Sequence, residues 1–242
     1  MAEPCQVCGT TDARLLVDQP SYRWVKCRSC GSAWISPMLS MDEAIEIQDE
    51  TVGQSCIDGY LKKLDSKMRR SRRWVRTLKR HMPGPKLLDV GSSMGFLVAA
   101  AAELGLEATG IEINPVLVEE AQRRYRAGRF VVGAFEETEL SGERFDGVYC
   151  SEVIEHVVDT NRFLETIAGA MNPKATLFLT TPALREYAKG SDPSRWRDFG
   201  VPDHKLYFSP GNIRQMRAKH GFEAIRIRFN FGRGLKLLAR RA

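Results

Sequence analysis

Residues 86–96 (KLLDVGSSMGF) constrain the fold of this chain more than any other stretch. Residues 86–90 are a short, mostly apolar run that contains Asp89, and such a run predicts a buried parallel strand. Residues 91–95 are a turn of small residues, and residues 96–104 (FLVAAAAEL) favour a helix. A strand, a glycine turn and a helix N-terminus in succession predict a binding site for a polar ligand, because the first helical N–H groups have no partner within the helix.

The glycine spacing and two carboxylates narrow the choice of ligand. Gly91 and Gly95 are four residues apart and no lysine follows them, so the turn fits neither the dinucleotide fingerprint nor the phosphate loop. Asp89 would repel a pyrophosphate but attract a cation. A second strand is predicted over residues 107–111, and Glu112 follows it at the position where doubly wound folds bind ribose hydroxyls. Together the carboxylates predict an adenosyl ligand that carries a positive charge.

Five motifs in order along the chain give a family resemblance. After DVGSSMG come GIEINP, FDGVYCSEVIEHV, ATLFLTTP and PDHKLYFSPGNIRQMRAKHGF. With these motifs the chain resembles the class I S-adenosylmethionine (SAM)-dependent methyltransferases over roughly residues 86–227. The resemblance implies an α/β fold with a doubly wound, mostly parallel seven-stranded sheet of Rossmann-like type, and SAM as cofactor.

The resemblance also implies a set of residues in contact with SAM. One position departs from the family pattern: Ser93 replaces the usual middle glycine, and a serine fits there if its φ is negative. Phe135 lies where the family contacts adenine, although a loop phenylalanine is as often part of the core. The expected cofactor residues are Asp89, Gly91, Ser92, Ser93, Gly95, Phe96, Glu112, Ile113, Ala134, Phe135 and Ser151.

Four cysteines near the N-terminus have the spacing of a zinc ribbon. Cys5 and Cys8 form one C-x2-C pair, Cys27 and Cys30 form another, and 18 residues separate the pairs. Two disulfides or a redox-active pair are the alternatives, but a cytosolic setting disfavours disulfides and two such pairs favour a metal. Four protein ligands leave no open position for water, so the expected Zn²⁺ is structural.

The domain organisation follows from these motifs and from the distribution of charge. We expect a zinc ribbon in residues 1–38, a helical linker or cap in 39–83 and the SAM-binding domain in 84–242. Apolar residues at three- and four-residue steps predict an amphipathic helix or helix pair over residues 58–82. Residues 62–80 also hold ten Lys or Arg and one acid, which is either a solvated face or a surface that attracts an acidic substrate or partner.

Two histidines are candidate bases for a methyl transfer that needs a proton removed. His156 ends the fourth-strand motif, so we expect it near the cofactor, where it acts in catalysis or bonds the backbone. His204 belongs to residues 183–208, a long polar connection after the predicted fifth strand. Such connections are often functional lids, and we expect this one to contact the acceptor.

The most direct functional interpretation is a SAM-dependent methyltransferase that acts on a small molecule, with a possibly anionic acceptor and the O-, C- or N-position open. The first alternative is an RNA methyltransferase that holds RNA with the ribbon and the basic helix. The second is a SAM-binding scaffold without catalysis. The sequence shows neither a signal peptide nor an apolar run long enough to span a bilayer, so we expect a cytoplasmic protein.

Overall fold

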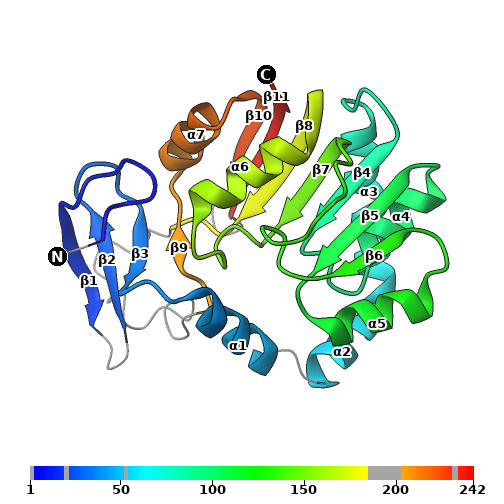
Figure 1. The fold of residues 1–242 in the computed structure, drawn as a ribbon, viewed down its shortest axis with the longest axis horizontal. Coiled ribbons are helices and arrows are strands. Elements are labelled where there is room, and N and C mark those ends of the chain that lie inside the picture. The colour runs from blue at the N-terminus through cyan, green and yellow to red at the C-terminus, as the bar shows by residue number, and fades with distance from the viewer. Residues whose placement is uncertain (1–2, 19–21, 52–53, 185–202, 231–233) are drawn as a thin grey trace.

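A seven-stranded sheet organises the larger part of the molecule (Figure 1). The computed structural model describes residues 3–18, 22–51, 54–184, 203–230 and 234–242. The strand order is β10-β11-β8-β7-β4-β5-β6, and the strands from β4 to β8 run parallel. The parallel strands are β4 (Lys86–Val90), β5 (Glu107–Glu112), β6 (Arg129–Val132), β7 (Phe145–Ser151) and β8 (Met171–Thr181). Two antiparallel strands, β10 (Phe222–Asn230) and β11 (Gly234–Arg241), complete it.

This order confirms the predicted doubly wound, mostly parallel sheet of seven strands. The chain enters at the central strand β4, moves outward to β5 and β6, and then returns to β7 on the other side of β4. The connections on the two sides of β4 therefore diverge at its carboxyl end. In open α/β sheets, ligands bind at that divergence.

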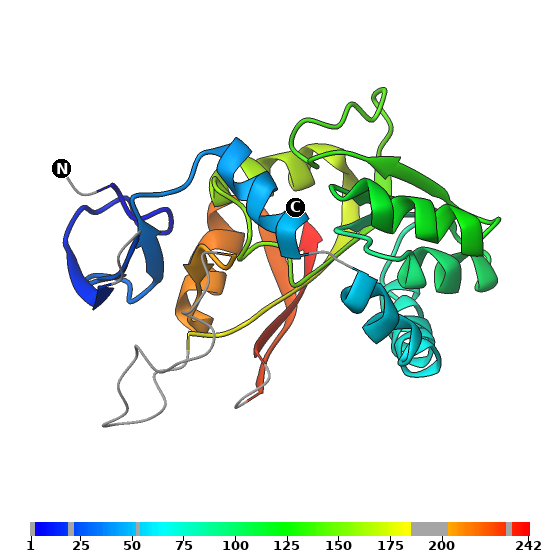
Figure 2. The ribbon, with the colours of Figure 1, turned by 90° about the horizontal axis from the view of Figure 1, so that it is seen from below.

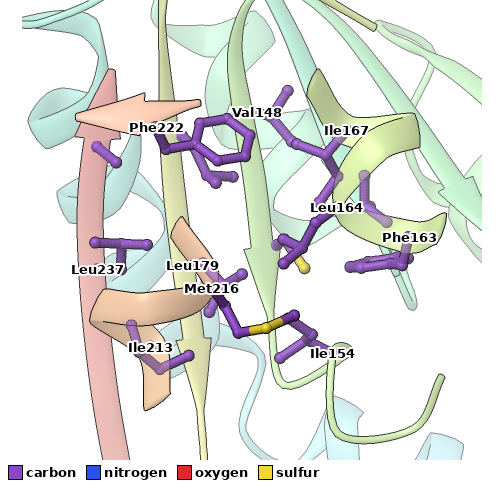
Figure 3. Packing of buried hydrophobic residues seen from close by; sticks show 14 of the residues in the cluster. Val148, Ile154, Phe163, Leu164, Ile167, Leu179, Ile213, Met216, Phe222 and Leu237 are labelled. Carbon is purple, nitrogen blue, oxygen red and sulfur yellow. The ribbon is translucent and has the colours of Figure 1, made fainter. Parts of the chain in front are cut away.

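Helices cover both faces of the sheet, and the alternation of side chains along the strands explains why. On β7, Val148 and Cys150 belong to one hydrophobic cluster and Tyr149 to the other. The first cluster takes in α6 (Thr160–Ala170) and α7 (Pro210–Lys219), whose Phe163, Leu164, Ile167, Ile213 and Met216 pack on Val148, Leu179 and Leu237 (Figure 3). The second takes in α3 (Leu64–Lys79), α4 (Phe96–Glu103) and α5 (Pro115–Arg124).

Side-chain caps set where three of these helices begin. Asn114 accepts N–H bonds at the start of α5, Asp159 does so for α6, and Ser209 forms a capping box with Asn212 at the start of α7. Asn114 directly follows Ile113 of the predicted ligand edge, and Asp159 comes three residues after His156. The caps therefore determine how closely the helix N-termini approach that edge.

The smaller sheet contains the N-terminal cysteines and one strand from far along the chain. It comprises β1 (Ala13–Asp18), β2 (Arg23–Cys27), β3 (Ala33–Ser36) and β9 (Leu206–Tyr207), all antiparallel. The sequence predicted residues 183–208 to be one connection. The structure instead places the end of that connection in the ribbon sheet, and residues 185–202 lie outside the described residues.

Three helices link the ribbon to the larger sheet. They are α1 (Met41–Thr51), α2 (Gln54–Leu61) and α3, and in Figures 1 and 2 α1 lies between the ribbon and α2. The helix expected over residues 58–82 is a pair, interrupted at the turn of Lys62 and Lys63. Met68, Val75 and Leu78 of α3 pack in the same cluster as α4. Among the described helices, none has the length and apolarity needed to cross a membrane.

Candidate active site

A cavity of about 420 Å³ opens at the carboxyl ends of β4, β5 and β7. This is the edge at which the strand order diverges, so the location agrees with the one expected for a ligand. The predicted cofactor residues on its wall are Asp89, Gly91, Ser92, Ser93, Phe96, Glu112, Ile113, Ala134, Phe135 and Ser151. Gly95 is not on the wall. It is the N-cap of α4, with φ +74°, where an added Cβ would lie 2.6 Å from the Phe130 ring.

The turn after β4 brings the backbone itself to the cavity. Gly91 has φ +72°, a conformation that favours glycine, and an added Cβ would lie 2.4 Å from Val153. The N–H groups of Gly91 and Ser92 both donate to the Ile111 carbonyl, each over 2.9 Å. These bonds fix the turn against the end of β5, so the glycine turn and Glu112 form one unit.

Ser93 differs from the expectation, because its φ is +49° rather than negative. The left-handed conformation costs an L-residue roughly 1–2 kcal/mol. Ser93 adopts this conformation because it orients the Ser93 N–H, which donates to Glu112 Oε2 over 2.8 Å. The bond to a carboxylate offsets the strain, and it also ties the turn to the second strand.

Two buried carboxyl groups give the cavity an acidic floor. Glu112 accepts from the N–H groups of Ser93 and Asn114, yet burial is the larger effect and raises its pKa. Burial, together with the charge of Glu112, raises the pKa of Asp89 well above its ordinary value. Both groups therefore gain from a cation nearby, since a positive ligand restores the charge that burial disfavours.

Two serine hydroxyls show that the cavity suits a polar ligand. Within the described residues, Ser92 Oγ and Ser93 Oγ are buried and have no hydrogen-bond partner. Buried hydroxyls without a partner are costly and uncommon in native proteins. Because both residues lie on the cavity wall, a ligand with hydroxyl, amino or carboxylate groups can supply the missing partners.

Phe135 combines the two roles that the sequence left open. It is buried in the first hydrophobic cluster, where its ring meets Phe163 edge-on at 5.6 Å between centroids. It also borders the cavity, next to Ala134. The ring therefore forms part of the core and part of the wall.

His156 also lies on the cavity wall and is held by Asp203. Its Nδ1 is 2.9 Å from Asp203 Oδ1 and 3.0 Å from the Asp203 carbonyl. Both partners are acceptors, so Nδ1 carries the proton and Nε2 is the basic nitrogen when the ring is neutral. Burial acts to lower the pKa of His156, but the hydrogen bond that it donates to Asp203 and the charge of Glu155 raise it above 6.5.

His204 is placed behind His156 rather than on the wall. Its ring meets the His156 ring edge-on at 4.6 Å, and its Nδ1 is 2.8 Å from the Tyr207 hydroxyl. His156 and Asp203 border the cavity, whereas His204 does not. The structure thus brings the two predicted histidines together, but only His156 faces the space where a substrate can bind.

Glu155 is a buried acid that the sequence analysis did not single out. Thr181 donates to its Oε2 over 2.9 Å, and burial raises its pKa to about 8. Glu155, His156 and His204 each offer a ligand atom within 4.8 Å of the others, so these three groups could also hold a cation. The motif SEVIEH was the signal in the sequence, but spacing alone did not separate Glu155 from Glu152.

The remaining side of the cavity is formed by α1, α2 and α3, here called the cap helices. Met41, Ala44 and Ile45 of α1 and Tyr60 of α2 contribute apolar surface, while Lys67 and Arg70 of α3 contribute charge. The sequence predicted the basic helix, but none of its residues was predicted to lie at the ligand site. Amphipathic spacing predicts which face of a helix is buried, not which polar residue borders a cavity formed by another element.

The four N-terminal cysteines form one cluster. Cys5 Sγ lies 3.6 Å from Cys30 Sγ, and Cys8 Sγ lies 3.5 Å from Cys27 Sγ. Zn–S bonds of about 2.3 Å at tetrahedral angles place sulfur atoms roughly 3.8 Å apart, so the four thiols fit a Zn²⁺ ion. All four are free thiols, and the close contacts run between the two C-x2-C pairs, unlike those of a redox-active pair.

Hydrogen bonds connect this ribbon to the segment that carries Asp203. Ile35 of β3 donates to the Lys205 carbonyl over 3.1 Å, and the Lys205 N–H donates to the Glu155 carbonyl over 2.6 Å. Asn212 of α7 donates to the Cys30 carbonyl over 2.9 Å. The ribbon is therefore packed against the His156 side of the site rather than standing apart from it.

Comparison with known proteins gives a family. A family profile described as a methyltransferase domain matches residues 60–227, which is more than half of the chain. A ubiquinone biosynthesis O-methyltransferase of Xanthomonas campestris pv. campestris is 35% identical over 105 residues, covering 41% of this chain and 44% of the relative. The human mitochondrial ubiquinone biosynthesis O-methyltransferase is 32% identical over 126 residues, 44% of this chain and 32% of that protein. This chain thus matches less than half the length of either relative.

Solved structures share the fold at low sequence identity. An amino pentose methyltransferase from Micromonospora echinaspora, solved with SAM, has a TM-score of 0.62 at 16% identity, covering 79% of this chain and 98% of that one. The magnesium protoporphyrin IX methyltransferase of Synechocystis PCC 6803, solved with bound SAH, has a TM-score of 0.61 at 17% identity. The match covers 82% of this chain and 100% of that one. These similarities establish the architecture of the larger sheet.

Proposed function

Because this chain belongs to the methyltransferase-domain family, we propose that it transfers a methyl group from SAM to a small-molecule acceptor. The observation that carries the proposal is the cavity beside β4, where Asp89 and Glu112 meet the glycine turn. An acidic floor suits the positively charged cofactor. The unpartnered serine hydroxyls on the same wall suit its polar groups.

The cofactor contacts divide among the residues of the floor. Glu112 would bind the ribose hydroxyls, and the glycine turn with Ser92 and Ser93 would bind the amino acid part. Ala134 and Phe135 would border the adenine. SAM supplies an electrophilic methyl group when it is bound.

His156 would act as the general base for the acceptor. Asp203 holds Nδ1 in its protonated form, which leaves Nε2 able to accept a proton from an acceptor hydroxyl. His204 would support the ring of His156 from behind, through the edge-on contact. The relatives named as O-methyltransferases favour a hydroxyl group as the acceptor, and such a hydroxyl is a weak nucleophile that benefits from a base.

The cap helices would bind the acceptor. Their apolar residues suit a carbon skeleton, and Lys67 and Arg70 support an acceptor with anionic character. Four zinc-bound thiolates in the ribbon would hold β3, and through β9 the Asp203 segment, in place. Thiols that bind zinc require a reducing compartment, which supports a cytoplasmic location.

Methyl-labelled SAM provides the test. Purified full-length protein is incubated with labelled SAM and, in parallel, with the small-molecule fraction or the RNA fraction of a cell extract. We expect label in a small molecule and in a hydroxyl-derived methyl ether. Label confined to RNA would contradict the acceptor class, and SAM binding without any transfer in either fraction would indicate a scaffold.

A further inference from the structure

The N-terminal half of α3 presents cations to a second hollow that adjoins the cavity. Lys63, Lys67 and Arg70 line it, with Ser55, Gly59, Tyr60 and Ser66. Three of these residues, Tyr60, Lys67 and Arg70, also border the cavity described above. A molecule bound near His156 can therefore extend into this hollow, here called the cationic hollow, without leaving the protein surface.

The arrangement of the three cations is costly for the helix. Lys63, Lys67 and Arg70 follow at steps of four and three residues, so they share one face of α3. Like charges at such spacing destabilise a helix. Lys63 is also the N-cap, where the helix dipole disfavours a cation. An anion in the hollow reverses both effects.

Three other cations of the same helix have structural partners. Arg72 forms an ion pair with Glu103 at 2.7 Å, Lys79 donates to the Leu104 carbonyl over 2.6 Å, and Arg73 lies over the Trp74 ring. The Lys67 ammonium lies 3.9 Å from the centre of the Tyr60 ring, and both residues border the cavity and the cationic hollow. Among the described residues, no carboxylate lies within ion-pair distance of Lys63 or Arg70.

The charge of the site is therefore divided between two sides. Asp89, Glu112 and Glu152 border the cavity from the sheet, and Lys67 and Arg70 border it from α3. Burial raises the pKa of the Tyr149 hydroxyl to about 12 and the charge of Arg70 opposes this, so the field of Arg70 reaches the strand ends. A sulfonium favours the acidic side and an anion the basic side, which enforces one orientation of the two substrates.

We propose that the cationic hollow binds a phosphate or diphosphate group of the small-molecule acceptor. Two lysines, one arginine and the Ser55 hydroxyl match the charge and the oxygen atoms of such a group, while the Ser66 hydroxyl donates to the Lys63 carbonyl over 2.8 Å. The phosphate anchors the acceptor at a distance from the methylated hydroxyl, which then lies toward His156. This inference rests on the proposed function, since it concerns the acceptor of the same reaction.

Inorganic pyrophosphate is the probe, and calorimetry at constant ionic strength measures its binding to the full-length protein. Arg70→Gln and Lys63→Gln should each weaken pyrophosphate binding about tenfold, because each removes a charged hydrogen bond. Arg69→Gln is the matched control, since Arg69 is exposed on the same helix and borders neither hollow. It should change the affinity less than twofold.

Two outcomes would overturn the proposal: undetectable pyrophosphate binding to the unaltered protein, or equal weakening by Arg69→Gln and Arg70→Gln. Equal weakening combined with tight, salt-sensitive binding of a single-stranded oligonucleotide would assign the helix to RNA instead. SAM is titrated separately on the same samples. SAM binding without pyrophosphate binding refutes only the hollow, whereas pyrophosphate binding without SAM binding refutes the proposed function.

Discussion

The two sides of the cavity differ in how their polar groups are held. On the sheet side, Glu112 is buried and bonded to the N–H groups of Ser93 and Asn114. On the helix side, Arg70 is exposed and the Lys67 ammonium lies 3.9 Å from the centre of the Tyr60 ring. The sheet side is therefore preorganised for one ligand, and the helix side can accommodate different acceptors. We therefore expect the sheet side to bind the cofactor and the cap helices to select the acceptor.

His156 borders the cavity and is the proposed base, so its replacement should have the largest effect. His156→Gln should lower kcat by roughly 10²–10³-fold, because the acceptor hydroxyl loses its base. SAM affinity, measured by calorimetry, should stay within about threefold of the unaltered protein. His81→Gln, which is remote from the cavity, serves as the control.

Binding of a second metal ion per chain, in addition to the ribbon Zn²⁺, that His156→Gln abolishes would contradict this role of His156. It would assign Glu155, His156 and His204 to metal binding instead. A fall in kcat of less than about threefold would also remove His156 from the chemistry.

Removal of the ribbon metal should disturb the helix side more than the sheet side. Cys8→Ser should abolish the binding of one Zn²⁺ per chain and make residues before β3 sensitive to protease, since structural zinc sites contribute directly to folding. Turnover should fall with it, because β3 pairs with β9 next to Asp203. Elemental analysis and limited proteolysis measure the first two effects.

Cys150→Ala is the matched control, since Cys150 is a buried thiol of the larger sheet. Its zinc content should equal that of the unaltered protein. Full zinc content in Cys8→Ser would show that the cluster is not the metal site.

Asp203→Asn should change the pH dependence of turnover. Asp203 raises the pKa of His156, so the neutral base form prevails only above that raised value. Without the carboxylate the pKa falls, and the acid limb of the kcat profile should move to lower pH, with turnover severalfold lower from poorer orientation. An unchanged limb would show that another group controls the profile.

The same pair should affect stability with a definite sign. The raised pKa of His156 gives stabilisation that is complete below pH 6.5 and lost as the pH rises through the raised value. Burial opposes ionisation of Asp203, but the bond from His156 lowers its pKa, so its stabilisation is lost as the pH falls below its ordinary 3.8. Urea unfolding across these pH ranges measures both.

Ser92→Ala should have the smallest effect and should separate stability from binding. Removing a buried hydroxyl without a partner should raise the free energy of unfolding of the ligand-free protein by about 1 kcal/mol. SAM affinity should fall by about fivefold, because the cofactor loses one hydrogen bond. Lower stability in urea, with unchanged affinity, would show that the hydroxyl has a partner within the protein.

The two sides also differed in how far the sequence predicted them. The sheet side comes from contiguous motifs, in which a strand, a turn and a helix N-terminus succeed each other, so Asp89 and Glu112 could be placed at one edge. The sign of φ at Ser93 could not be predicted, because it depends on a hydrogen bond to Glu112 on another strand. Gly95 matched the motif, yet its role is to admit the Phe130 ring.

The rest of the cavity could not be predicted from the sequence, because it is formed by contacts between distant segments. Asp203 meets His156 only because β9 joins the ribbon sheet, a pairing between residues far apart in sequence. Two-residue strands have no periodicity that a pattern can reveal. Lys67 and Arg70 were predicted to belong to a basic helix but not to the cavity, because they reach the cavity only where α3 packs against segments far away in the sequence.

SAM affinity in two charge variants tests the division of the cavity most directly. Calorimetry is performed on Glu112→Gln and Arg70→Gln under identical conditions. Glu112→Gln should weaken SAM binding by about tenfold, a loss of about 1.4 kcal/mol, while Arg70→Gln should leave it unchanged or slightly tighter. Unchanged affinity in Glu112→Gln together with a loss in Arg70→Gln would contradict it, because the cofactor would then lie on the side of the cap helices.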